Sequence, residues 1–288
     1  MHMDRFCILD ELASMGMKDH NKKELVLTLE GQKPATKIFG DFPGIESFCR
    51  RHGLSILRAS YCIKKNIDSG KNGWSNSAKK ATDGTPVFFI SGKEEDSKRA
   101  KQYDEENNDM EFGKIMGYPE CDINFFLNNR EKANSKQGDF ALLTLKNTSA
   151  NLPYNYLNNF ISRYFGYSLI SHFPHSFNCK KSAEMAEDNY RTLCKYSKRW
   201  ANRFVRAQKS VILFSEYDGV FMLKNYTYNK TLTYDPGELG CTCDNFISKA
   251  LSSGNNIEII GKNHLIIKKN NVGLLELEGE DYGIMIFE

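Results

Sequence analysis

One long helical pattern followed by a series of strand patterns sets the strongest limit on what this chain can fold into. Over residues 182–209, apolar side chains recur at the spacing of one helix face, at Ala186, Tyr190, Leu193, Ala201, Phe204 and Val205. Ser182 is the predicted N-cap. Acidic residues near the start and basic residues near the end match the helix dipole. We therefore expect a long helix over these residues.

The pattern changes to short strands from residue 210 onward. Gly or Asn turns separate strand patterns over 211–216, 219–225, 230–234, 257–260, 264–268, 272–276 and 283–287. A short helical pattern covers residues 246–251. We predict an antiparallel β-rich module over residues 209–288.

The first part of the chain mixes helix and strand patterns. We predict strands over 24–30, 54–63, 86–91 and 140–145, helices over 45–52 and 154–164, and an exposed loop over 68–84. Residues 93–116 are strongly charged and indicate a loop followed by a helix, and Pro119 suits the first turn of a further helix. The expected fold is α+β. A mixed α/β domain with long central helices covers 1–208, and the β-rich module packs on it.

Composition narrows the classes of protein to consider. The 288 residues are 40% hydrophobic and 12% aromatic, which predicts a packed core. The formal net charge of +3 is too small to indicate nucleic-acid binding by itself. Basic residues gather over 180–209, but a solvated helix face explains them better than a nucleic-acid surface. No apolar run approaches the length of a membrane span, and no signal peptide is visible. We expect a cytoplasmic protein with reduced cysteines.

The residues best suited to chemistry lie just before the predicted long helix. His172, His175 and Cys179 fall within eight residues, and imidazole and thiolate are ligands that zinc and iron prefer. A second group, Cys121 and Asp122, follows a Gly-x-Pro break at the start of another predicted helix. We expect the two helix starts to meet, so that Cys121 or Asp122 completes a metal site begun by His172, His175 and Cys179.

The segments GYPECD (117–122) and HFPHSFNCKKS (172–182) resemble two motifs of a family of uncharacterised bacterial and archaeal proteins, domain of unknown function 483. Those motifs are Gly-x-Pro-x-Cys-Cys and His-x-Pro-Cys-Ser-x-x-Cys-x-x-Ser, and the similarity covers roughly residues 110–205. Asp122 stands in place of the second cysteine of the first motif, and His175 in place of the first cysteine of the second motif. Both replacements are metal-ligand types. The resemblance thus implies a metal site rather than a dithiol or iron–sulfur site, and it implies no particular reaction.

These residues predict a metal-dependent enzyme, a hydrolase or an oxygenase, that acts on a small polar molecule. The metal could be zinc or iron(II), because coordination by Cys121 favours zinc and coordination by Asp122 favours iron. The catalytic candidates are Cys121, Asp122 and Cys179. Arg163 and Arg191 are candidates for binding a substrate carboxylate, since a guanidinium group can donate two parallel hydrogen bonds to it.

Two other interpretations stand beside this one. In the first, the chain is a non-catalytic binding protein, and its His/Cys cluster is a closed structural zinc site. In the second, it is a metal-free cysteine enzyme with Cys121 or Cys179 as nucleophile, a histidine as base and Asp122 as orienting group. Cys241 and Cys243 lie near glycines without a second cysteine pair, which favours a loop with incidental thiols.

Overall fold

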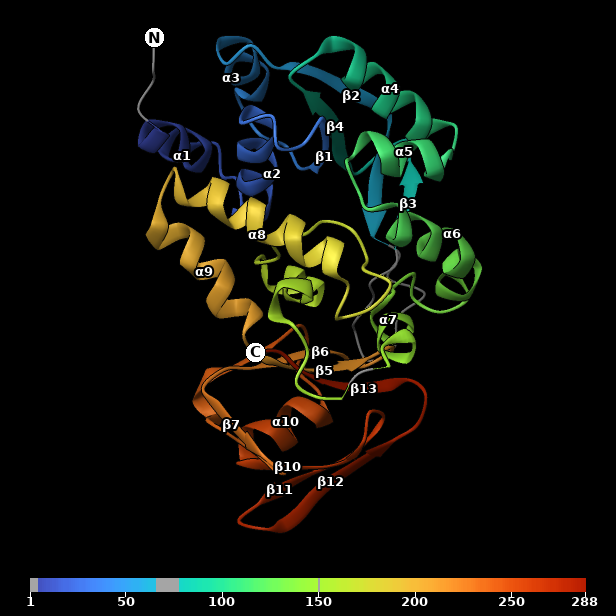
Figure 1. Ribbon diagram of the computed structural model, residues 1–288, viewed down its shortest axis with the longest axis vertical. Coiled ribbons are helices and arrows are strands. Elements are labelled where there is room, and N and C mark those ends of the chain that lie inside the picture. Colours follow the sequence, from blue (N-terminus) through green and yellow to red (C-terminus); the bar gives the residue numbers. More distant parts are fainter. Residues whose placement is uncertain (1–4, 66–77, 150) are drawn as a thin grey trace.

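The computed structural model describes residues 5–65, 78–149 and 151–288, which fold into three antiparallel sheets with helices between them. Figure 1 shows the first sheet and its helices at the top, a central group of helices, and two further sheets at the bottom. The expected α+β class is confirmed, with a mixed N-terminal region, central helices and antiparallel C-terminal sheets. No helix among these residues is both long and apolar enough to cross a membrane.

The N-terminal region is a four-stranded sheet with helices around it (Figure 1). Its spatial order is β1-β4-β2-β3, with strands β1 (Ala35–Phe39), β2 (Ser55–Lys65), β3 (Ala78–Ala81) and β4 (Thr85–Ser91). Its helices are α1 (Arg5–Ser14), α2 (Asp19–Leu29), α3 (Ile45–Arg51), α4 (Glu94–Glu105) and α5 (Asp109–Ile115).

Alternating side chains of β4 pack against different helices on the two faces of this sheet. Phe88 and Ile90 belong to the large core that includes side chains of α2 and α3. Val87 and Phe89 instead join a smaller core with side chains of α4 and α5. Successive side chains of a strand point to opposite faces, so one apolar run supplies both cores.

The predicted elements of this region are partly confirmed. The helix over 45–52 and the strands over 54–63 and 86–91 are present. In the predicted loop over 68–84, residues 78–81 form β3, and residues 68–77 lie outside the described residues. The loop predicted at the start of 93–116 is wrong, because α4 occupies 94–105. This helix is mostly exposed and carries i,i+4 ion pairs such as Glu94–Lys98. It therefore needs few apolar residues, and its sequence lacks a clear helical pattern.

The predicted strand over 24–30 is also wrong, because these residues lie in or next to α2. Helix α2 packs against both β1 and α8 (Lys180–Cys194), and Leu25, Val26 and Leu27 are all fully buried. A helix buried on all sides loses the one-sided apolar stripe. The short alternation of apolar and polar residues over 24–30 therefore resembles the pattern of a strand.

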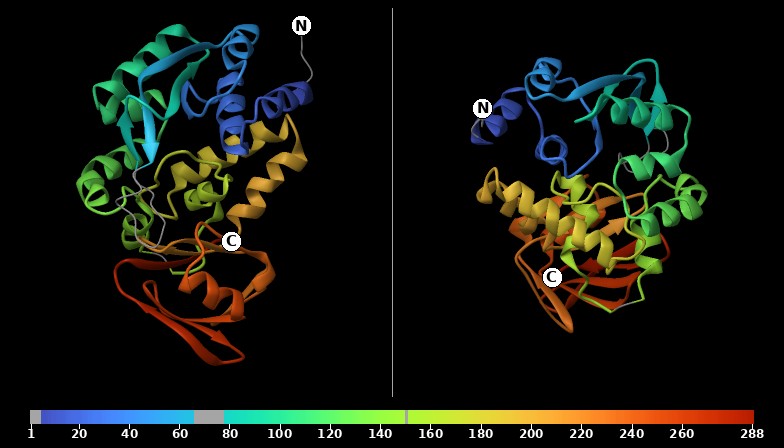
Figure 2. Two further views of the ribbon diagram at one scale, coloured as in Figure 1. Left: turned by 180° about the vertical axis from the view of Figure 1, so that it is seen from behind. Right: turned by 45° about the horizontal axis from the view of Figure 1, so that its top comes forward.

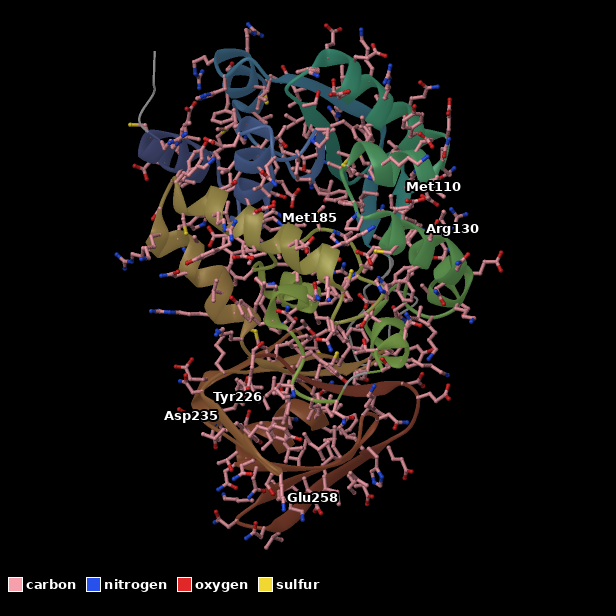
Figure 3. All side chains as sticks on the ribbon, viewed as in Figure 1. Met110, Arg130, Met185, Tyr226, Asp235 and Glu258 are labelled. Atoms are coloured by element: carbon pink, nitrogen blue, oxygen red, sulfur yellow. The ribbon has the colours of Figure 1, made fainter. Side chains whose placement is uncertain are left out.

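The central helices connect the N-terminal sheet to the C-terminal sheets. They are α6 (Glu120–Asn134), α7 (Ala141–Asn147), α8 and α9 (Lys198–Gln208), with short 3-10 segments η2 (Tyr156–Asn158) and η3 (Phe160–Phe165). Arg130, labelled in Figure 3, reaches from α6 to Asp109 at the start of α5. The N-terminal region and the central helices are thus joined by ion pairs as well as by apolar contacts.

Three predictions for the central helices are corrected by the structure. Residues 140–145 form most of α7 instead of a strand, and Ala141, Thr144 and Leu145 are buried at helical spacing. The helix predicted over 154–164 is two 3-10 segments. The single helix predicted over 182–209 is two helices, because Ser197 caps α9 by accepting a hydrogen bond from the Trp200 N–H.

The C-terminal region contains two antiparallel sheets. The first has the order β13-β5-β6-β9, with β5 (Val211–Ser215), β6 (Gly219–Leu223), β9 (Leu239–Cys241) and β13 (Tyr282–Ile286). The second has the order β12-β11-β10-β8-β7, with β7 (Tyr226–Asn229), β8 (Thr231–Tyr234), β10 (Asn256–Gly261), β11 (His264–Lys269) and β12 (Val272–Glu278). The 3-10 segment η4 (Pro236–Glu238) precedes β9, and α10 (Phe246–Ser253) lies between the two sheets (Figure 2, left). The strands and short helix predicted here are confirmed.

The first of these sheets is buried on both faces. Ile212 and Phe214 of β5 belong to the large core shared with the helices, whereas Val211 and Leu213 belong to the core around α10. The large core therefore extends across residue 208, where the sequence predicts a boundary between two domains. That division stays a prediction.

Replacing Gly113 with alanine is expected to lower the free energy of unfolding by about 1–3 kcal/mol. A Cβ atom at Gly113 would lie 2.8 Å from Cγ1 of Ile123, a side chain of α6 that is 4% exposed. Chemical denaturation of this variant measures the loss. Gly92→Ala is the matched control, because a Cβ at Gly92 meets no atom within 4 Å. Equal stability of the two variants would contradict the prediction.

Candidate metal centre

The starts of two central helices, α6 and α8, are far apart in the sequence but meet in space. Cys121 and Asp122 lie in the first turn of α6, whose N-cap is Pro119. Cys179 is the N-cap of α8, and His175 lies in the loop that leads to it. Hydrogen bonds between Asp122 and His175 join the two segments, so the structure brings together the two groups that the sequence singled out.

Cys121, Asp122, His175 and Cys179 form a group that could hold a metal ion. One ligand atom from each residue lies within 4.8 Å of the others, and the two sulfur atoms are 3.9 Å apart. Two thiolates that bind one tetrahedral zinc at about 2.3 Å are about 3.8 Å from each other, so the observed separation fits a shared ion. Asp122 and Cys179 are buried, but the His175 side chain is 34% exposed. Solvent therefore reaches one side of the group.

The Asp122 carboxylate organises this group by accepting hydrogen bonds on both oxygen atoms. Its Oδ1 accepts from the His175 backbone N–H at 2.8 Å and from the His175 ring Nδ1 at 2.7 Å. Its Oδ2 accepts from the Ser182 hydroxyl and lies 3.1 Å from Nε2 of His172. The thiols of Cys121 and Cys179 lie farther from the same two oxygen atoms, at 3.7 and 3.9 Å. The nitrogen and hydroxyl donors therefore make the four closest contacts, which equals the number of lone-pair positions on a carboxylate, about four.

Burial and hydrogen bonding set the protonation states around Asp122. Burial raises the pKa of Asp122, but the hydrogen bonds from His172, Ser182 and His175 outweigh it and hold this pKa well below its usual value. Burial also lowers the pKa of His172. Burial, together with Asp122 and Cys179, raises the pKa of Cys121 to about 12. Without a metal ion, Asp122 is ionised while Cys121 keeps its proton.

Side chains from other segments fix the loop that carries His175. Asn147 of α7 donates a hydrogen bond to the His175 carbonyl at 2.8 Å. Asn158 of η2 donates to the carbonyl oxygens of Phe177 and Cys179, both at 3.0 Å. These contacts could not be predicted from the sequence, because an asparagine that bonds a distant loop leaves no local pattern.

His172 lies beside the group of four and contacts it through Asp122. Its Nε2 is 2.9 Å from the Ser182 hydroxyl, and its Nδ1 is buried without a hydrogen-bond partner among the described residues. Its ring lies 5.1 Å from the ring of Tyr118. Ser182 is not the N-cap that the sequence predicts, since Cys179 takes that position. The Ser182 hydroxyl faces Asp122 because residues 179 and 182 are one helical turn apart.

No family model, no curated protein and no solved structure matches the chain. The resemblance to the family with two cysteine motifs therefore depends on the motif residues alone. The two positions that depart from those motifs, Asp122 and His175, are hydrogen-bonded to each other. A carboxylate and an imidazole in contact thus stand where the motifs have two cysteines.

The two predicted substrate-binding arginines are engaged with carboxylates outside the group of four. Arg163 lies 2.7 Å from Asp139, and its guanidinium group is 4.5 Å from the centre of the Phe173 ring. Arg191 is exposed on α8 and lies 2.6 Å from Glu187. Their role in binding a substrate stays a prediction.

The other predicted thiol pair lies in the C-terminal region. All eight cysteines are free thiols. Cys241 is exposed at the end of β9, and the Cys243 thiol donates to the Asp218 carbonyl at 2.8 Å. Neither belongs to the group of four around Asp122.

A buried charge cluster lies near His172, and sequence reasoning missed it. Glu24 lies 2.7 Å from Nζ of Lys23 and 2.5 Å from Nζ of Lys33, and Ser171 donates a hydrogen bond to it. The Lys33 ammonium group is 5.5 Å from the centre of the Tyr118 ring, which in turn contacts His172. Lys23 and Lys33 lie outside the predicted strand over 24–30, and no local pattern predicts that they are buried together with Glu24.

Proposed function

We propose that this chain is a zinc-dependent hydrolase that acts on a small polar molecule. Cys121, Cys179 and His175 bind the zinc ion, and Asp122 orients His175. The observation that carries this proposal is the convergence of two sulfur atoms 3.9 Å apart with an imidazole and a buried carboxylate. Zinc held by three protein ligands activates a water molecule at its fourth position.

The hydrogen bonds of Asp122 argue for an open fourth position. Each oxygen atom of this carboxylate already has two close donors from the protein, so we treat Asp122 as saturated and assign the metal ion to the other three residues. Its contact with Nδ1 of His175 requires a proton on Nδ1, which leaves the lone pair on Nε2 for the metal. A carboxylate that fixes a ligating histidine in this way is common at zinc sites.

The ligand types favour zinc over iron(II). A non-haem iron site of the common kind needs two histidines and a carboxylate around the ion. Here His172 and His175 both bond to Asp122, and His172 is not among the residues whose ligand atoms converge. Two sulfur ligands are typical of zinc.

The two alternatives, a metal-free cysteine enzyme and a closed structural zinc site, fit the group of four less well. A cysteine nucleophile needs a lowered pKa, whereas burial raises the pKa of Cys121 to about 12. A closed structural zinc site needs four protein ligands, and the fourth would have to be the saturated Asp122.

Metal analysis tests the ligand assignment directly. Protein purified without added metal is expected to contain about one zinc per chain, as in other sites with three or four ligands. Cys121→Ser, Cys179→Ser and His175→Ala are expected to lose most of this zinc, measured by elemental analysis and by zinc titration. Cys241→Ser removes an exposed thiol and serves as the control. Wild-type protein that neither contains nor binds zinc would refute the proposal.

Cobalt substitution tests whether the fourth position is open. The visible spectrum of the cobalt-substituted protein is expected to change when azide is added, because an anion can replace bound water at an open position. An unchanged spectrum would indicate a closed site with four protein ligands. That result would favour the non-catalytic binding protein over the hydrolase.

A further inference from the structure

A cleft with a volume of 710 Å³ lies between the central helices and the turns of the C-terminal sheets. One wall is formed by α7 and by α6 from Phe125 onward, and Phe125, Leu142 and Leu143 contribute apolar surface to it. Small-molecule sites have volumes of about 300–1,000 Å³, so this cleft has the size of one. None of the four residues of the candidate metal centre, Cys121, Asp122, His175 and Cys179, lines this cleft.

A buried carboxyl group lines this cleft. Glu216, in the turn between β5 and β6, is 2% exposed, and its Oε1 accepts a hydrogen bond from the Gln137 N–H at 2.9 Å. Burial raises the pKa of Glu216 to about 7. The charged groups that face it are Asp139 and Asp281, which raise this pKa further, and Lys136, which lowers it.

A half-buried lysine lines the cleft as well. Lys262 lies in the turn between β10 and β11, and its ammonium group donates to the Thr148 carbonyl. Within the described part of the chain, no carboxylate lies in ion-pair distance of Lys262. Lys136 and Lys146, which also line the cleft, lie 2.7 Å from Asp281 and 3.8 Å from Glu280.

We infer that this cleft binds a small organic carboxylate with a short apolar chain. The carboxylate pairs with Lys262 and accepts a hydrogen bond from the acid form of Glu216, while the chain lies against the apolar wall. An ammonium group and a neutral acid together present one positive charge and two donors, which suits a single carboxylate. Ionised Glu216 would repel the same ligand.

Titration calorimetry with hexanoate tests this inference. Neither the inference nor the test depends on the proposed metal centre. Hexanoate is expected to bind with a dissociation constant of about 1 mM or lower, which corresponds to ordinary affinity per atom for a ligand of this size. Acetate lacks the chain and hexanol lacks the charge, so both are expected to bind at least tenfold more weakly. Because Glu216 must be protonated, hexanoate affinity is expected to fall about tenfold from about pH 6 to pH 8.

Two variants separate the roles of the lysine and the acid. Lys262→Met is expected to weaken hexanoate binding about tenfold, the usual effect of losing a charge-assisted hydrogen bond. Glu216→Gln keeps a donor but cannot titrate, so it is expected to bind hexanoate without the pH dependence. Lys269→Met, at the exposed end of β11, is the control, and thermal melting of each variant checks that it is folded. The inference is overturned if wild-type protein shows no saturable binding of hexanoate, or if folded Lys262→Met binds it as well as the control does.

Discussion

Replacing Glu24 with glutamine is expected to lower the free energy of unfolding by about 3–5 kcal/mol, because two buried ammonium groups then lose their counter-charge. Glu24 is 1% exposed and lies 2.7 Å from Nζ of Lys23 and 2.5 Å from Nζ of Lys33. Thr36 and Ser171 also donate hydrogen bonds to its carboxylate. Glutamine has nearly the same size, so the substitution changes charge and hydrogen bonding more than packing.

This stabilisation should also depend on pH. Burial raises the pKa of Glu24, but the charges of Lys23 and Lys33 outweigh it and hold this pKa well below its usual value. A carboxyl group whose folded-state pKa is lowered stabilises the protein fully above its unfolded pKa of about 4.3, and the stabilisation is lost as pH falls through the folded value. Wild-type protein is therefore expected to lose this contribution below about pH 4.

Urea unfolding over a series of pH values measures both effects. The difference in stability between wild type and Glu24→Gln is expected to be largest near neutral pH and to shrink in acid. Glu184→Gln removes an exposed carboxylate from α8 and should leave stability nearly unchanged. A loss below about 1 kcal/mol at neutral pH for Glu24→Gln would show that the lysines do not need this charge.

Replacing Asp122 with alanine is expected to weaken zinc binding by at least about 100-fold and to lower the unfolding free energy of the metal-free protein by about 3 kcal/mol. The variant removes the acceptor for the His175 backbone N–H, the His175 ring and the Ser182 hydroxyl. Those donors lie in or beside the buried space that Asp122 occupies, so leaving them without partners costs stability. The loop would also lose the contact that fixes the His175 ring.

The Asp122→Asn variant distinguishes an orienting carboxylate from a metal ligand. Asparagine keeps one oxygen acceptor, so zinc binding is expected to fall by about 10–100-fold, the usual effect of changing a group that orients a ligand. Zinc titration of Asp122→Asn beside Cys121→Ser makes the comparison. If both variants lose zinc binding to the same extent, Asp122 is a ligand and the fourth position is not open.

The sequence predicts the residue types of the candidate metal centre well, and their contacts only in part. The Gly-x-Pro break and the helical pattern after residue 179 placed Cys121, Asp122 and Cys179 at helix starts, where they are found. The sequence could not show that His172 bonds to Asp122 and Ser182 instead of joining the group of four. The difference depends on the directions of two side chains, and spacing along the chain does not record those directions.

The sequence by itself determined the antiparallel C-terminal strands, since alternating apolar residues and Gly or Asn turns favour hairpins wherever they occur. Only the tertiary structure decided that residues 19–29 form a helix, that 182–209 bend into two helices, and that Glu24 sits between two lysines. Local patterns report which side of an element meets water. An element enclosed on every side has no such asymmetry, so its form and its charge partners depend on the segments packed around it.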